Sequence, residues 1–202
     1  SASLFNVVYG AISAALQALG GLSDLVIGTS AAGRTDPDYF DTIGYFTTVV
    51  AHRVRFGDDP TVGTLIGNIK DMINGSMPFT DIPIDLVEDA LGMTPGMDHL
   101  FDVFIQIHAQ NKLNGNLPAP DGGTIAFRQV DPDKHESHLG LQFEVMEEVI
   151  DGNRAIRVLM SYQARRYSPA QVEAIRASVM SMFTQFSRGD ASNMNISQLA
   201  RT

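Results

Sequence analysis

The chain has 202 residues and a formal net charge of −9, from 14 basic and 23 acidic side chains. Hydrophobic residues make up 44% and charged residues 18%, the balance of an ordinary globular protein that can bury a sizeable core. The acidic balance argues against nucleic acid or an anionic membrane as the main partner, because phosphate recognition needs clustered Lys and Arg.

Residues 3–19 are rich in Ala and Leu, with apolar residues at helical spacing and on much of the other face. We predict a helix that is buried on several sides and stopped by Gly20-Gly21. Because a natural domain rarely begins on such a helix, we expect the chain to be a segment of a longer one. Residues 25–27 predict a short buried strand ended by Gly28, and residues 43–56 resume with strand-forming residues.

The rest of the chain alternates helices, strands and loops. We predict helices at residues 61–73, ended by Asn74-Gly75, at 84–91, and from Ser168-Pro169 to about Phe186. We predict strands at residues 99–110, 124–130, 139–149 and 155–162, with Asp151-Gly152 as a hairpin turn. Residues 111–123, rich in Asn, Gly and Pro, predict a loop, and residues 131–137 a polar turn.

No cysteine is present, which excludes a disulfide framework, a thiolate zinc site and a cysteine nucleophile. The composition fits a reducing compartment, and we expect a cytoplasmic protein. No signal peptide is visible, and the longest apolar tract, residues 4–19, is too short to span a bilayer. Four arginines could form a local basic patch: Arg154, Arg157, Arg165 and Arg166. The simpler interpretation is that they are solvated strand and turn residues.

Two neighbouring motifs carry a family resemblance. Residues 28–34 read GTSAAGR, and residues 43–53 read IGYFTTVVAHR. They resemble the second half of the condensation domains of nonribosomal peptide synthetases, which carry G-T-x-x-x-G-R and then I-G-x-F-V-N-T. Thr48 and Val49 stand where that family usually has Asn and Thr. Residues 79–85 are similar to its H-Q-D-x-P-F-E motif, in which Asp81 and Pro83 match.

The resemblance implies an α/β fold of the chloramphenicol acetyltransferase-like class, with a mixed sheet packed against helices. It covers essentially the whole chain but only the second half of the complete domain. We therefore expect residues 1–188 to form the C-terminal lobe, with the N-terminal lobe absent. Residues 189–202 are expected to be a polar tail, a docking segment or the start of a linker.

Complete domains of this family join a donor acyl or peptidyl thioester to an acceptor amine. Their catalytic signature, H-H-x-x-x-D-G, occurs nowhere in this sequence, and none of its histidines fits it: His52, His99, His108, His135 and His138. Without that histidine no evident group positions or deprotonates an amine. We therefore expect no catalytic residue in this chain and no acyl transfer by the chain alone.

The resemblance also implies partners. Substrates would arrive on the phosphopantetheine arms of donor and acceptor peptidyl carrier proteins, with no directly bound cofactor and no metal. The N-terminal lobe of the same domain is a further expected partner, as is an adenylation domain reached through the C-terminal linker. Nucleic acid and membrane are not expected as partners.

In the complete enzymes two lobes enclose a substrate tunnel, and this chain resembles one wall of it. The candidate substrate-binding residues follow strands expected to end near the middle of the sheet: Gly28, Thr29, Ser30, Tyr45, Phe46 and Thr48. Gly28 would let the backbone approach a substrate arm, while the Thr and Ser residues would offer hydroxyls. The alternative interpretation is that all six are ordinary turn and strand residues.

Other polar groupings favour structural roles. His135 and His138 have H-x-x-H spacing but no third ligand, which favours exposed turn residues over a metal site. Asp81 and Asp85 favour a helix cap and an exposed residue over an acid–base pair, and His108 favours a structural histidine over one facing a cleft. For Arg34 and Arg53 we expect structural ion pairs in preference to substrate binding.

Two further hypotheses remain beside the amide-forming one. The chain could belong to a non-catalytic, degenerate relative that docks carrier proteins or other partners, or to an epimerisation, heterocyclisation or free-standing acyltransferase relative. The sequence upstream of Ser1 discriminates among them. An H-H-x-x-x-D-G motif there favours amide formation, a degraded motif favours the non-catalytic role, and D-x-x-x-x-D favours heterocyclisation.

Overall fold

The computed structural model describes residues 2–94, 96, 99–108, 115–128, 130, 137, 139–150 and 153–200. Its helices are α1 (Leu4–Gly20), α2 (Val62–Ser76), α3 (Ile84–Ala90), α4 (Pro169–Phe186) and α5 (Ile196–Leu199). Its strands are β1 (Asp24–Ala31), β2 (Thr48–Arg55), β3 (Val103–His108), β4 (Gly115–Pro118), β5 (Thr124–Phe127), β6 (Leu141–Ile150) and β7 (Asn153–Tyr162). Short 3-10 turns lie at η1 (Pro37–Tyr39), η2 (Met77–Phe79) and η3 (Ala191–Asn193).

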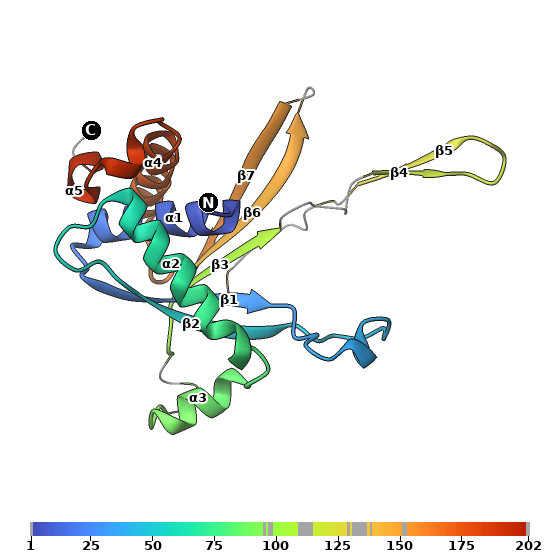
Figure 1. Ribbon diagram of the computed structural model, residues 1–202, viewed down its shortest axis with the longest axis horizontal. Helices are drawn as coiled ribbons and strands as arrows, with labels where there is room; N and C mark the ends of the chain where they lie inside the picture. The colour runs from blue at the N-terminus through green and yellow to red at the C-terminus, as the bar shows by residue number, and fades with distance from the viewer. Residues whose placement is uncertain are drawn as a thin grey trace.

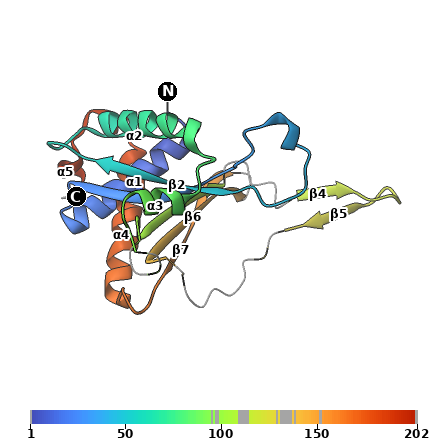
Figure 2. The same cartoon turned by 90° about the horizontal axis from the view of Figure 1, so that it is seen from below.

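A five-stranded sheet in the order β2-β1-β3-β6-β7 forms the centre of the fold (Figure 1). The pairs β1–β2 and β6–β7 are antiparallel, whereas β1–β3 and β3–β6 are parallel. The strands β4 and β5 form a separate antiparallel hairpin, which projects from the body as an arm (Figures 1 and 2). The predicted mixed sheet packed against helices is confirmed.

Helix α1 lies inside the helical layer and packs against α4 and α2. Its central positions carry small residues, and Ala11, Ala14 and Ala15 have no exposed surface, so the neighbouring helices can approach closely. Ser3 caps its start, and Gly21, in the left-handed conformation with φ of 60°, ends it. The predicted helix buried on several sides is confirmed.

The helix-covered face of the sheet supplies the other half of the core. Ile27, Ile105, Phe143 and Val145 are each at most 1% exposed and belong to one cluster with α1, α2 and α4. They stand at alternate positions of β1, β3 and β6, which the register aligns on a single face. The predicted alternation in β3 and the predicted strand pair β6–β7 are both confirmed.

Two predicted strand boundaries are wrong. β1 continues through Gly28 to Ala31, because these residues pair with residues 48–51 of β2, and the ring of Phe101 covers the place where a side chain at Gly28 would stand. A Cβ added at Gly28 would lie 2.4 Å from that ring. β2 begins at Thr48 and not at residue 43, because the preceding residues belong to a loop held by Arg34.

Three further predictions are wrong in their bounds. Helix α2 passes through Asn74-Gly75 and ends at Ser76, whose hydroxyl donates a 2.8 Å hydrogen bond to the Ile73 carbonyl. β3 begins at Val103, four residues later than expected. Gly115–Pro118, expected in a loop, forms β4, because pairing with β5 outweighs the weak strand preference of Gly, Asn and Pro. The predicted turns at 131–136 and 151–152 lie outside the described residues.

The C-terminal segment packs onto the loop before α2. Ile196 and Leu199 are 1% exposed and join the main core. The Asp59 carboxylate accepts hydrogen bonds from the Ser197 amide at 2.9 Å and from its hydroxyl at 2.7 Å. Asp59 also has a positive φ of 55°, the only such value among the described non-glycine residues. This turn therefore holds the end of the chain against the body.

Candidate functional site

The six predicted site residues lie at one end of the β1–β2 pair. Gly28, Thr29 and Ser30 are in β1, Thr48 is the first residue of β2, and Tyr45 and Phe46 belong to the preceding loop. Thr48 is paired with Ala31, and side chains alternate between the faces along each strand. Thr29 and Thr48 therefore point to the helix-covered face, while Gly28 and Ser30 point to the other. The structure brings the backbones together but places the Ser30 hydroxyl on the face opposite the two threonine hydroxyls.

Internal hydrogen bonds use the two threonine hydroxyls. Thr29 is 4% exposed and donates to the Ile105 main-chain oxygen at 2.6 Å, which ties β1 to β3. Thr48 donates to the main-chain oxygen of Thr80, which ties the start of β2 to the turn after η2. Each hydroxyl hydrogen thus has a structural acceptor within the chain.

The opposite face of β1 is aromatic. The Phe101 ring lies against Gly28, and its centroid is 6.1 Å from that of Phe104. Ser30 is half-buried on the same face. An extended ligand that approaches Gly28 from this side would meet the Phe101 ring before it reached the backbone.

The loop before β2 is organised by Arg34. Its guanidinium donates to the main-chain oxygens of Tyr39 and Gly44, the latter at 3.2 Å, and lies 4.1 Å from the centroid of the Phe46 ring. Gly33 has φ of 64°, and a Cβ there would lie 1.6 Å from the Phe46 oxygen. Only glycine fits this approach. The predicted ion pair of Arg34 is wrong, because carbonyl oxygens and an aromatic ring take the place of a carboxylate.

The apolar side chains of this loop face outward. Tyr45 is 88% exposed and Ile43 is fully exposed, and Tyr39 and Phe40 are about half exposed. Phe46 is half-buried, because Arg34 lies on one face of its ring and the Tyr39 ring is centred 5.8 Å away. Of the six predicted residues, Tyr45 is the one most accessible to a ligand or partner.

Sequence reasoning missed a buried polar network beneath β2. The Nε2 atom of His52 lies 2.8 Å from the Ser76 hydroxyl, and its Nδ1 atom lies 3.5 Å from the Tyr9 hydroxyl. Burial lowers the pKa of His52 to about 4 and raises the pKa of Tyr9 above its ordinary value. The one available signal was the alternation that puts His52 on the same strand face as Val50 and Val54.

This network is not a nucleophile–base pair. Ser76 uses its only hydroxyl hydrogen to donate to the Ile73 oxygen at 2.8 Å. With that hydrogen on the Ile73 oxygen, the contact to His52 assigns the Nε2–H tautomer, in which Nε2 donates to Ser76 and cannot remove its proton. The Tyr9–His52–Ser76 network joins α1, β2 and α2 as a structural device.

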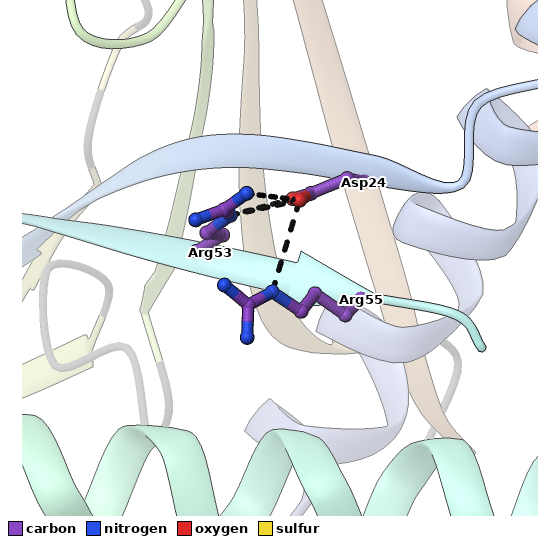
Figure 3. Close-up of polar contacts among 3 residues, drawn as sticks. All are labelled: Asp24, Arg53 and Arg55. Atoms are coloured by element: carbon purple, nitrogen blue, oxygen red, sulfur yellow. Dashed lines mark hydrogen bonds and ion pairs between the residues drawn. The ribbon is translucent and has the colours of Figure 1, made fainter.

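The predicted ion pair of Arg53 is confirmed (Figure 3). Its Nε atom lies 3.0 and 2.8 Å from the two carboxylate oxygens of Asp24, and Arg55 Nε lies 3.8 Å from the same carboxylate. The hydrogen bond from Arg53 lowers the pKa of Asp24, and the same bond raises the pKa of Arg53. The carboxylate of Asp24 in β1 thus contacts two guanidinium groups of β2, the first strand in the sheet order.

The predicted basic group is largely paired. Arg154 lies 2.7 Å from Glu147, Arg157 lies 2.7 Å from Glu148, and Arg166 contacts Asp102 with both terminal nitrogens. Three of the four arginines thus have carboxylate partners, which leaves little excess charge for an anion.

Within the described ranges, no cluster of three or more His, Cys, Asp or Glu side chains could hold a metal ion. His135 and His138 lie outside those ranges. The same part of the chain contains no helix with the length and apolarity needed to cross a membrane. Asp81 and Asp85 are exposed.

Three surface cavities are lined wholly by residues that the structure describes, and none of these three is lined by the six predicted site residues. A cavity of about 380 Å³ lies between the end of β2 and α2, and one of about 360 Å³ lies between β6–β7 and α4. The third, of about 180 Å³, lies where the C-terminal segment meets the loop after β2.

Comparison with known proteins finds relatives that include large synthetases. The chain is 25% identical over 156 residues to fusarin C synthetase of Gibberella moniliformis, covering 76% of this chain and 4% of that protein. It is 28% identical over 177 residues to CymA of Salinispora arenicola, a probable non-canonical nonribosomal peptide synthetase, covering 87% of this chain and 2% of that protein. The chain therefore spans only a few per cent of the curated relatives it matches.

Solved structures agree on the fold. The X-domain from teicoplanin biosynthesis superposes with a TM-score of 0.75 at 21% identity, covering 96% of this chain and 43% of that one. The condensation domain of the monacolin K polyketide synthase MokA superposes with a TM-score of 0.74 at 20% identity, covering 95% and 42%. The fold is thus the chloramphenicol acetyltransferase-like one expected from the sequence. Because the family model named Condensation domain matches residues 1–199, the chain belongs to the condensation domain family.

Proposed function

We propose that this chain is the C-terminal, tunnel-forming lobe of a condensation domain. The complete domain would make an amide bond between a carrier-bound thioester donor and an acceptor amine in nonribosomal peptide synthesis. The observation that carries the proposal is the family match over residues 1–199, combined with coverage of only 40–44% of the solved single condensation and X-domains. The H-H-x-x-x-D-G motif is absent from the sequence, so its histidine would come from the other lobe.

The arm and the loop before β2 support a second lobe as partner. All four residues of β4 and of β5 are exposed, including the apolar side chains Leu117, Ile125 and Phe127. An isolated two-stranded hairpin is marginally stable in water, so such an arm needs a surface to lie on. The loop with Ile43 and Tyr45 extends from the same end of the molecule as the arm (Figure 2). Exposed apolar side chains of this kind, gathered at one end of the molecule, are typical of an interaction surface.

In this proposal the six residues at the end of β1 and β2 form one wall of the tunnel. Tyr45 reaches a substrate arm directly, whereas Thr29 and Thr48 hold the wall in place through their hydrogen bonds to Ile105 and Thr80. Substrates come on phosphopantetheine arms of donor and acceptor carrier proteins, with no cofactor bound by the chain. An adenylation domain follows through the C-terminal linker, and the assembly is cytoplasmic.

A non-catalytic docking domain is the alternative. The X-domain from teicoplanin biosynthesis, which has the same fold, was solved in complex with OxyB, and the internal use of both threonine hydroxyls suits a structural wall. Epimerisation, heterocyclisation and free-standing acyltransfer are further reactions that the wall would equally serve.

The test supplies donor and acceptor amino acids on carrier proteins and measures amide formation by mass spectrometry. We expect no amide from the 202-residue chain alone, and turnover when the encoded region upstream of Ser1 is expressed with it. Replacing the second histidine of an upstream H-H-x-x-x-D-G motif by Ala should abolish that turnover. Amide formation by the chain alone would refute the lobe assignment, and an inactive complete domain that binds carrier proteins would support the docking alternative.

A further inference from the structure

The outer edge of β2 carries main-chain groups that no strand covers. β2 is the first strand in the sheet order, so within the described residues it has a neighbour on one side only. Phe56 donates its amide to the Ser23 oxygen at 3.0 Å, which makes this a hydrogen-bonded pair at the end of the ladder. Pairs alternate along antiparallel strands. Ala51, Arg53 and Arg55 therefore direct their N–H and C=O groups outward.

A cavity lies directly beside these outward groups. It has a volume of about 380 Å³ and is lined by residues 53–55 of β2 and by one face of α2: Leu65, Asn68, Ile69 and Met72. The α2 residues recur at spacings of three and four, so a single mostly apolar helix face closes one side. A strand added to β2 would place every second side chain against this face.

The other side chains of an added strand would meet positive charge. Arg53 and Arg55 lie on the sheet face opposite α2, and they share the single carboxylate of Asp24 (Figure 3). Arg55 is 3.8 Å from that carboxylate and its side chain is 68% exposed, so it is the less engaged of the two. Two guanidinium groups and one carboxylate leave one net positive charge at the edge.

We propose that the β2 edge binds an extended peptide segment of a partner protein, by strand addition, with acidic and apolar residues in alternation. Two acidic side chains, two residues apart, pair with Arg53 and Arg55, and the apolar residue between them enters the cavity under α2. A second copy of β2 fits poorly, because it would bring its own arginines to this edge. The site is separate from the proposed tunnel wall and does not depend on it.

The test uses the full chain and the peptide acetyl-Thr-Val-Glu-Val-Glu-Val-Thr-amide as probe. We expect saturable binding below about 1 mM, and slower hydrogen exchange at the amides of Ala51, Arg53 and Arg55 in the unmodified protein. A peptide with Lys in place of Glu should bind at least about threefold more weakly. Exchange at these amides that the Glu peptide does not change would overturn the proposal.

Two variants test the geometry. Ala51→Pro removes one outward donor and keeps the ladder to β1, because proline is tolerated where the N–H faces solvent on an edge strand. It should abolish peptide binding, and Arg55→Glu should weaken binding at least about threefold, with Arg188→Glu as the distant control. Equal binding by Arg55→Glu and the unmodified chain would contradict the charge pairing. A third outcome would show that a second copy occupies the edge. In it the unmodified chain binds no peptide but forms concentration-dependent dimers, and Ala51→Pro forms none.

Discussion

His52 Nε2 lies 2.8 Å from the Ser76 hydroxyl, and this contact joins the centre of β2 to the end of α2. The imidazole is 4% exposed and burial holds its pKa near 4, so it is neutral in the folded protein. Unfolding releases it to an ordinary pKa of about 6.5. Between these two values the unfolded chain binds a proton that the folded chain does not.

The free energy of unfolding should therefore fall as the pH is lowered from about 6.5 to about 4, by up to about 3 kcal/mol from this group. Above pH 6.5 the imidazole is neutral in both states, so the free energy of unfolding carries no loss from protonation of His52. Urea unfolding at a series of pH values measures it, with His52→Gln as the matched variant. The difference between the two proteins should shrink as the pH falls, and parallel pH profiles would contradict the role of His52.

Replacing Gly33 should disrupt the loop before β2. Its φ of 64° and the 1.6 Å approach of a Cβ to the Phe46 oxygen mean that Gly33→Ala costs more than about 2 kcal/mol. Gly67→Ala in α2, where nothing lies within 4 Å, is the control and should stabilise by about 0.5–1 kcal/mol. Thermal unfolding compares them. Equal effects would mean that the loop does not constrain Gly33.

The Thr48 hydroxyl should matter for stability. Thr48→Val leaves the oxygen of Thr80, a residue only 3% exposed, without this donor, and we expect a loss of about 1–3 kcal/mol. Thr48→Ser keeps the hydroxyl and should lose much less. Thr47→Val, at the exposed neighbouring position, serves as the control in urea unfolding. If Thr48→Val were as stable as Thr47→Val, the structural role of the Thr48 hydroxyl would be refuted.

The turn at Asp59 should control how firmly the C-terminal segment is held. Asp59→Ala loses the bonds to the Ser197 amide and hydroxyl and should destabilise by about 1–2 kcal/mol. Limited proteolysis should then cut near residues 190–199 first. Asp58→Ala, at the exposed adjacent position, should change little. Deleting residues 190–202 removes buried Ile196 and Leu199 and should cost more than the point substitution. Unchanged proteolysis of Asp59→Ala would show that core packing alone holds the segment.

The isolated chain should self-associate through its exposed apolar loop. Ile43 is fully exposed and Tyr45 is 88% exposed. Light scattering should show an apparent mass that rises with concentration, and the double replacement Ile43→Ser with Tyr45→Ser should reduce this rise. Leu19→Ser is the control, because Leu19 is about half exposed and lies near the C-terminal end of α1. A strict monomer at high concentration would show that these side chains do not associate.

Local chemistry was sufficient for the elements whose ends are marked by residues close by in the sequence. Helix α1 follows from an apolar pattern that ends in Gly20-Gly21, and helix α4 follows from the Ser168-Pro169 start, which the structure closes with a capping box. The β6–β7 pair follows from alternation on either side of a hairpin turn. The motifs at residues 28–34 and 43–53 were enough to indicate the family.

Packing decided what residue types could not. Glycine is typical of a strand end, yet β1 continues through Gly28 because it pairs with Ala51 of β2, and the Phe101 ring takes the place of its side chain. Its charge predicts a carboxylate partner for Arg34, but in the folded loop its guanidinium contacts main-chain carbonyl oxygens and the Phe46 ring. Strand register sends Thr29 and Ser30 to opposite faces of the sheet. Which hydroxyls face a ligand and which face the core is a property of that register, and only the tertiary structure establishes it.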